Sequence, residues 1–119
     1  MLQEFVPGDF LIFQLESGYA LLRVLDVEDS DGDPVWHIAA YGDLFLDPET
    51  AEAAIDSLGA LAVEIPHAAL TNRAFESTQV AKMKNIPLTA ADLSGYDAWK
   101  NSGDQPVSDR SVRLLLGLR

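Results

Sequence analysis

Short apolar runs separated by turn residues fill the first third of the chain and predict three consecutive β-strands. The run Asp9–Leu15 and the run 19–27 are rich in aliphatic and aromatic residues, and the connection between them ends at Gly18. This spacing predicts a β-hairpin, with the glycine in the left-handed conformation. A third apolar run, 35–41, follows an acidic loop that contains turn-forming Asp-Gly and Pro residues. Residues 10–13 are apolar without interruption, so we expect the first strand to be covered on both faces.

Residues 47–59 form the clearest helical pattern of the chain. Asp47 lies at the N-cap, Pro48 at the first helical position and Gly59 just past the end. Apolar residues recur at helical spacing, which predicts one buried stripe of Ala51, Ala54, Ile55 and Leu58. The opposite face carries only acids, without a neighbouring lysine or arginine: Glu49, Glu52 and Asp56. Solvent-exposed helix faces are stabilised by pairs of opposite charges three or four residues apart, and this face has no such pair.

The rest of the chain mixes weaker strand and helix patterns. Residues 60–66 predict a fourth strand. A short helix is predicted over residues 76–84, and another over residues 89–100, which begins with the capping-box variant Thr-Ala-Ala-Asp. Residues 111–119 alternate valine and leucine with other residues and predict a closing strand, with a final helix as the alternative.

These elements together predict an α+β fold in a single domain of 119 residues. We expect a β-meander over residues 1–46, a helix over 47–59 and a mixed strand and helix region over 60–119. The sheet is predicted to be a bent antiparallel sheet or a partly open small β-barrel, an SH3-like meander, packed by two or three helices.

Charge is distributed unevenly along the chain, whose net charge is −11. Residues 1–72 hold 14 acids and one base, Arg23, whereas residues 73–119 hold 5 acids and 7 bases. Such segregation produces a directional field over the surface. It argues against a nucleic-acid partner, which requires lysine and arginine contacts to phosphates, and it favours a basic protein partner.

Six acids are the predicted contacts for that partner: Asp29, Asp31, Asp33, Glu49, Glu52 and Asp56. The segment Asp-Ser-Asp-Gly-Asp also suggests calcium. An EF-hand loop requires glycine at its sixth position and glutamate at its twelfth. Neither possible register of this segment provides both, so we predict no EF-hand, and the sequence leaves weak cation binding of another kind open.

The residue types that carry common chemistry are sparse. The chain has no cysteine, so disulfides, thiolate metal sites and cysteine nucleophiles are excluded. The two histidines, His37 and His67, have no neighbours at zinc-binding spacing, and no motif indicates a serine nucleophile. We therefore predict a non-enzymatic protein without cofactor or metal. The alternative is a small enzyme or ligand-binding domain with a pocket lined by Trp36, His37 and Tyr41.

Aromatic residues gather near the acids of the predicted meander: Phe10, Phe13, Tyr19, Trp36 and Tyr41. An aromatic cage for methylated ammonium groups is one interpretation, but we favour the core of the domain. Residues 70–79 are rich in hydrogen-bonding side chains around Phe75. They suit either a recognition loop or, as we favour, the cap and turn at the start of a short helix, with Arg73 either extended along apolar surface or paired with an acid.

Targeting signals are not visible in the sequence. The N-terminal residues lack the basic region of a signal peptide, and acids or turn residues interrupt every apolar run. None of these runs reaches the ~20 residues that a membrane helix requires. We expect a cytoplasmic protein that does not bind membranes. The sequence leaves the oligomeric state and the identity of the partner open.

The opening of the chain resembles a family of bacterial immunity proteins associated with polymorphic toxin systems. That family begins with Gly-Asp, an aliphatic strand, a turn and an aromatic strand that runs into Arg-Val. Residues 8–25 match this pattern at Gly8, Asp9, Tyr19, Arg23 and Val24. The resemblance implies a small β-rich protein that binds and neutralises a cognate toxin without catalysis.

Overall fold

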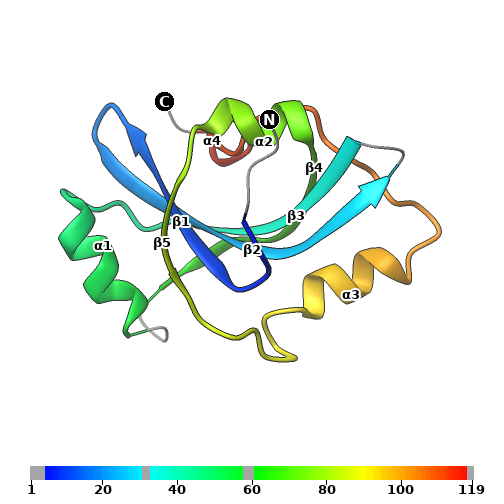
Figure 1. Ribbon diagram of the computed structural model, residues 1–119, viewed down its shortest axis with the longest axis horizontal. Helices are drawn as coiled ribbons and strands as arrows, with labels where there is room; N and C mark the ends of the chain where they lie inside the picture. Colours follow the sequence, from blue (N-terminus) through cyan, green and yellow to red (C-terminus); the bar gives the residue numbers. More distant parts are fainter. Residues whose placement is uncertain (1–4, 31–32, 58–60, 118–119) are drawn as a thin grey trace.

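An antiparallel sheet of five strands forms the centre of the molecule (Figure 1). The computed structural model describes residues 5–30, 33–57 and 61–117. The strands lie in the order β4-β3-β2-β1-β5. The first four strands therefore pair in the order of the chain, and β5 pairs with β1. Their bounds are β1 (Asp9–Leu15), β2 (Gly18–Ser30), β3 (Asp33–Tyr41), β4 (Val63–Thr71) and β5 (Ala81–Asn85). The predicted α+β class is confirmed, and the sheet is open, with β4 and β5 at its edges.

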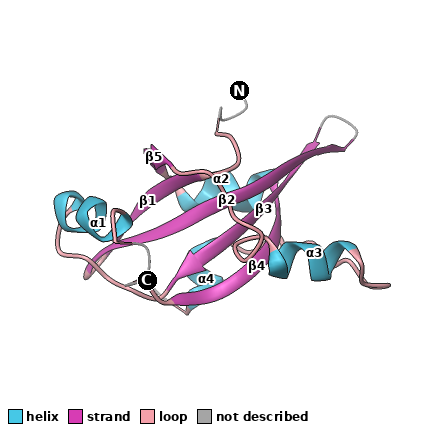
Figure 2. Cartoon of the chain, turned by 90° about the horizontal axis from the view of Figure 1, so that it is seen from below, coloured by secondary structure: helices cyan, strands magenta, loops and turns pink. Residues whose placement is uncertain are grey.

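Four helices in the described part of the chain pack on this sheet, rather than the two or three that were predicted. They are α1 (Pro48–Ile55), α2 (Asn72–Thr78), α3 (Ser94–Lys100) and α4 (Val112–Leu116). Side chains of α2 and α4 pack on one face of the sheet, and side chains of α1 and α3 pack on the other. Figures 1 and 2 show α1 and α3 near opposite ends of the sheet.

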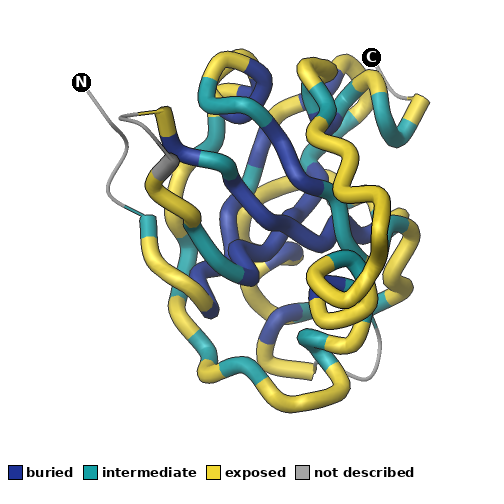
Figure 3. Tube along the Cα trace, turned by 90° about the vertical axis from the view of Figure 1, so that its right-hand side faces the viewer, coloured by how far each residue is buried: buried dark blue, intermediate teal, exposed yellow. Residues whose placement is uncertain are grey.

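Strand alternation divides the core between the two faces of the sheet. The face under α2 and α4 holds Leu11, Phe13, Leu22, Val24, Trp36 and Ile38. The other face holds Phe10, Leu21 and Tyr41 under α1, and Leu25 and Ala39 under α3. The buried trace in Figure 3 runs through the middle of the molecule. β1 is therefore covered on both faces, and the core interpretation of the aromatic residues is confirmed for all but the half-buried Tyr19.

The acidic loop predicted between residues 27 and 35 is mostly strand. β2 continues to Ser30 and β3 begins at Asp33, so Asp29 and Asp33 lie on a long hairpin. The pairing of β2 with β3 shifts register at Leu25, between Val24 and Asp26, as in a β-bulge. Such a bulge inserts one residue and reverses the side-chain alternation of the strand beyond it.

The helix predicted over residues 47–59 is present as α1. The Asp47 carboxylate accepts a hydrogen bond from the Thr50 backbone N–H (2.7 Å), which confirms the N-cap. Ala51 and Ile55 are buried and Ala54 is half-buried, as the stripe predicts. The helix ends at Ile55. Leu58 and Gly59 lie outside the described residues.

β4 begins later and continues further than the strand predicted over residues 60–66. It passes through Pro66, which was expected to end it, and reaches Thr71. The pairing of β3 with β4 shifts register beside Pro66, between Ile38 and Ala40. Proline lacks the N–H that a ladder requires, and it is tolerated at a bulge of an edge strand.

The helix predicted over residues 76–84 is wrong. α2 begins at Asn72, where Thr71 caps it, and it ends before Gln79, which has a φ of 57°. β5 then pairs with β1 over residues that include the end of the predicted helix. The open edge of β1 supplies backbone partners that outweigh the local preference for a helix. The capping interpretation of residues 70–79 is confirmed.

The end of the chain also differs from the prediction. The capping-box hydrogen bonds of Thr89 and Asp92 are formed, but residues 90–93 form a turn and α3 begins only at Ser94. The closing strand predicted over residues 111–119 is wrong, and the alternative helix is present as α4. Ser111 caps α4, and Gly117 ends it with a φ of 70°.

Candidate functional site

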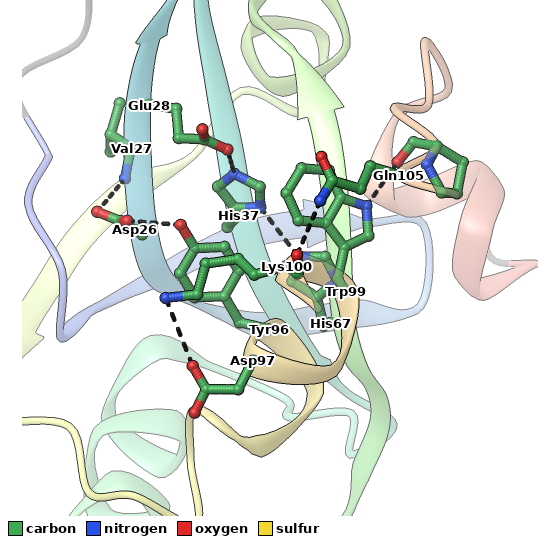
Figure 4. Close-up of polar contacts among 11 residues, drawn as sticks. Asp26, Val27, Glu28, His37, His67, Tyr96, Asp97, Trp99, Lys100 and Gln105 are labelled. Carbon is green, nitrogen blue, oxygen red and sulfur yellow. Dashed lines mark hydrogen bonds and ion pairs between the residues drawn. The ribbon is translucent and has the colours of Figure 1, made fainter. Parts of the chain in front are cut away.

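The bulge at Leu25 brings two carboxylates onto the face of the sheet under α3. Before the bulge, even-numbered residues of β2 such as Val24 face α2. Beyond it, Asp26 pairs with His37, and Glu28 pairs with Val35 on the same face. Asp26 and Glu28 therefore lie beside His37, in the part of the sheet that α3 covers (Figure 4).

A chain of hydrogen bonds joins Glu28, His37 and His67. His37 is completely buried, and its Nε2 lies 2.5 Å from Glu28 Oε1 while its Nδ1 lies 2.9 Å from His67 Nε2. An ionised carboxylate can only accept, so His37 Nε2–H donates to Glu28. The neutral His37 then accepts at Nδ1 from His67 Nε2–H. The geometry thus assigns one tautomer to each ring.

Aromatic groups of α3 cover this chain of hydrogen bonds. The Tyr96 hydroxyl donates to the Asp26 carboxylate (2.7 Å), and its ring centroid lies 4.3 Å from that of His37. The Trp99 ring meets His37 edge-on at 4.7 Å. The Lys100 ammonium lies over the Tyr96 ring at 4.6 Å. We call Asp26, Glu28, His37, His67 and Tyr96 the histidine cluster.

Burial controls the protonation of the histidine cluster. It lowers the pKa of His67 to about 4, and the charge that His37 would carry contributes to this lowering. Burial also lowers the pKa of His37, although the Glu28 and Asp26 carboxylates oppose that change. The pKa of the Tyr96 hydroxyl is raised by burial and by its hydrogen bond to Asp26. At neutral pH both rings are therefore uncharged, and the tyrosine keeps its proton.

The hydrogen bonds of the histidine cluster end at a second histidine. A carboxylate followed by a histidine resembles the orienting part of a hydrolase triad, but the next group is a second histidine and not a nucleophile. Four cavities along the described residues are lined by other side chains. Among the described residues, no group of three or more His, Asp or Glu could hold a metal ion. The cluster instead joins α3 to β2, β3 and β4.

Sequence reasoning missed this cluster because its members are far apart in the chain. The sequence placed His37 only in an alternative pocket with Trp36 and Tyr41. The bulge at Leu25 and the shift of register in β4 decide which side chains meet His37, and neither leaves a local signal in the sequence. The one available indication was that the chain's two histidines both occur in or beside predicted strands.

The three residues of the predicted pocket do not line one cavity. Trp36 faces α2, where its ring stacks on Phe75 with 3.9 Å between centroids. His37 faces α3. Tyr41 stacks on Phe10 and borders a small cavity of about 270 Å³ together with Arg23.

The predicted partner-binding acids lie at two ends of the molecule. Asp29 and Asp33 are exposed near the tip of the β2–β3 hairpin, whereas Glu49, Glu52 and Asp56 are exposed on α1. These two regions are separated along the 38 Å axis of the molecule (Figures 1 and 2). The structure therefore does not bring the two groups together. Asp31 lies outside the described residues.

The residues behind the immunity-protein resemblance hold the sheet together. Gly8 has a φ of +94°, and a Cβ there would lie 2.7 Å from the Ile86 carbonyl oxygen. Burial alone would raise the pKa of Asp9, but hydrogen bonds from Val6 N–H and Asn85 and the nearby Lys82 hold that pKa below its usual value.

Arg23, a third matching position, is only 2% exposed. It donates to the Ile86 carbonyl (2.7 Å) and pairs with Asp92 (3.1 Å). Its guanidinium therefore ties the segment after β5, and the turn before α3, to β2.

Comparison of the chain with family models, curated proteins and solved structures finds no match in any of the three. The resemblance to immunity proteins therefore remains a prediction. Within the described residues, none of the helices is long and apolar enough to cross a membrane.

Proposed function

We propose that this chain is a non-enzymatic acidic binding protein that engages a basic protein partner, as an immunity or inhibitor protein would. The main support is that four of the predicted contacts have no ion pair with any described residue: Asp29, Asp33, Glu49 and Glu52. All four are exposed. The fifth, Asp56, is paired with Lys84 at 2.6 Å.

The chain's own bases are mostly engaged elsewhere. Arg23 pairs with Asp92, and Arg73 pairs with Asp109. Lys82, Lys84 and Lys100 each lie within 3.5 Å of an aspartate carboxylate oxygen. Most of the described positive charge is thus compensated locally, and the net charge of −11 is carried by surface acids. This arrangement supports attraction of a basic protein over the distance of a Debye length, about 8 Å at physiological salt.

Exposed leucines next to α1 add an apolar contact to this charge. Leu46, directly before the N-cap, is 87% exposed, and Leu44 is 46% exposed. A residue at the position of Leu46 often packs against the first turns of its helix, but this leucine does not. Apolar side chains among acids suit a protein partner, because complementary charge guides the encounter and apolar burial holds the complex.

The alternative of an enzyme or ligand-binding pocket has less support. Trp36, His37 and Tyr41 face different elements, and no member of the histidine cluster lines any of the four cavities. The proposal keeps the cytoplasmic location predicted from the sequence.

Capture from a lysate of the source organism tests the proposal. The immobilised wild type is compared with a variant carrying Asp29→Asn, Asp33→Asn, Glu49→Gln and Glu52→Gln, which changes charge with little change in shape. We expect the wild type to retain a basic protein that elutes at high salt and that the variant retains weakly. Mass spectrometry identifies that protein, and purified components confirm direct binding. A partner retained equally by both forms, or no retained protein, would contradict the proposal.

A further inference from the structure

A groove of about 570 Å³ lies between the start of β3 and α2, at the hairpin end of the molecule. Pro34 and Val35 of β3 and Thr71 of β4 line one part of it. Asn72, Arg73, Glu76 and Ser77 of α2 line the other part. It is the largest of the four cavities, and large, partly apolar cavities with a few converging polar groups are the usual places for ligands.

Two acids give this groove a negative charge. Asp33 and Glu76 both line it. Its one base, Arg73, is paired with Asp109, and the Arg73 Nε lies 3.3 Å from Asp109 Oδ1. Asp29 lies opposite Pro34 in the β2–β3 pairing, so a third carboxylate is close to the groove. The uncompensated charge at this end of the molecule is therefore negative.

Apolar surface accompanies these carboxylates. The half-buried Val35 and the buried Pro34 supply the aliphatic lining of the groove, whereas the Thr71 and Ser77 hydroxyls already donate to Asp109 and to the Ala74 carbonyl oxygen. An arginine or lysine side chain matches such a site, because its methylene groups can pack on apolar surface while its charged end meets a carboxylate.

We propose that this groove binds an extended, arginine-bearing segment of the partner, with a cationic side chain between Asp33 and Glu76. The inference rests on the proposed function and specifies where on the molecule that function is located. It selects the hairpin end over the acidic face of α1. The α1 acids then contribute to the long-range field without contacting the segment.

Trp36 provides a built-in reporter of the groove. Its indole Nε1–H donates to Asn72 Oδ1 (2.9 Å), and Asn72 also donates to Glu76. A segment bound against Asn72 and Glu76 would change the environment of this indole. The chain's second tryptophan, Trp99, donates to the Pro106 carbonyl oxygen (3.0 Å) on the other face of the sheet and serves as an internal control.

Titration of the isotopically labelled protein with the peptide acetyl-Arg-Val-Arg-Val-Arg-amide tests the inference by NMR. We expect a saturable shift of the Trp36 indole signal and of backbone signals of α2, with the Trp99 indole signal unchanged. The same peptide with glutamate in place of arginine should cause no shift. Added salt should weaken binding, because the attraction is between charged groups.

Two matched variants locate the contact. Asp33→Asn with Glu76→Gln removes two charges at the groove and keeps the Glu76 side-chain oxygen that accepts from Asn72. Glu49→Gln with Glu52→Gln removes two charges at α1. We expect the groove variant to weaken peptide binding by about tenfold and the α1 variant by about twofold or less. Circular dichroism confirms that both variants fold.

The outcomes separate the inference from the function on which it rests. Shifts that gather around Glu49 and Glu52, or a stronger loss in the α1 variant, would overturn the groove assignment and leave the basic-partner proposal in place. Absence of any saturable shift would also overturn the groove assignment. If, in addition, the lysate experiment retains no basic protein, the proposed function fails as well.

Discussion

His37 and His67 show how single residues of this chain are controlled by their surroundings. His37 is fully buried between a carboxylate and the second histidine, and each ring has one defined tautomer at neutral pH. Protonation of both rings to the imidazolium form would place two positive charges side by side below Tyr96. The pair therefore tolerates acid poorly, since the two sites titrate together.

Stability should fall as the pH drops from about 6.5 towards 4. The pKa of His67 is lowered to about 4 in the folded chain, whereas an unfolded histidine titrates near 6.5. Below pH 6.5 the unfolded chain binds a proton that the folded chain does not bind, so the free energy of unfolding decreases by up to about 3 kcal/mol near pH 4.

Replacement His67→Gln tests this pH dependence, because glutamine keeps a hydrogen-bonding group beside His37 without the titrating ring. Urea unfolding at neutral pH and near pH 4.5 should show a smaller loss of stability for the variant than for the wild type. Equal losses in both proteins would show that titration of His67 does not control the acid response.

Gly95 decides how closely α3 approaches the sheet. A Cβ at this position would lie 3.1 Å from His67 Cβ and 3.2 Å from the Pro66 carbonyl oxygen. These atoms belong to β4 and have little freedom to move. The glycine therefore permits the contact that covers the histidine cluster, at a cost in helix propensity of about 1 kcal/mol relative to alanine.

Replacement Gly95→Ala should destabilise the protein by about 1 kcal/mol, although alanine favours helices, because the methyl group pushes α3 away from β4. Gly103→Ala is the matched control, since a Cβ there meets no atom within 4 Å. Thermal unfolding of the two variants measures the difference. A Gly95→Ala variant as stable as the control would mean that α3 shifts without loss.

Elements with strong local signals could be predicted from the sequence, and elements made by long-range pairing could not. β1 has the predicted bounds, and α1 begins at the predicted cap, because apolar runs and N-caps act locally. β5 was predicted as helix, because only the free edge of β1 makes it a strand. α4 was assigned as a strand because so short a helix leaves an apolar pattern that fits both periods.

The candidate sites also differ in how far the sequence could predict them. The exposure of Glu49 and Glu52 follows from the helix pattern and was predictable. The histidine cluster could not be predicted, because it depends on a bulge at Leu25. The separation of the hairpin acids from the α1 acids depends on the length of β2, which continues to Ser30 although the sequence predicts its end at residue 27.

The molecule as a whole carries more negative charge than its own bases compensate. With a net charge of −11, the folded chain concentrates like charges that the unfolded chain would separate. Self-repulsion of this kind destabilises the compact state and is reduced by salt. The same acids would become favourable contacts once a basic partner binds.

Salt should therefore stabilise the free protein. Between about 0.01 M and about 1 M sodium chloride the Debye length falls from about 30 Å to about 3 Å. We expect the melting temperature to rise by roughly 4 °C, equivalent to about 1 kcal/mol. The variant with Asp29, Asp33, Glu49 and Glu52 neutralised should show a smaller rise. An equal rise in both proteins would assign the effect to general salting-out.

The association rate of the captured basic partner, measured against ionic strength, tests the acidic-surface proposal most directly. For the wild type we predict a rate that falls at least about tenfold from low to high salt. For the variant with the four acids neutralised we predict a slower rate with a weaker dependence on salt. Identical rates and identical salt dependence for the two proteins would contradict the proposal that these carboxylates attract the partner.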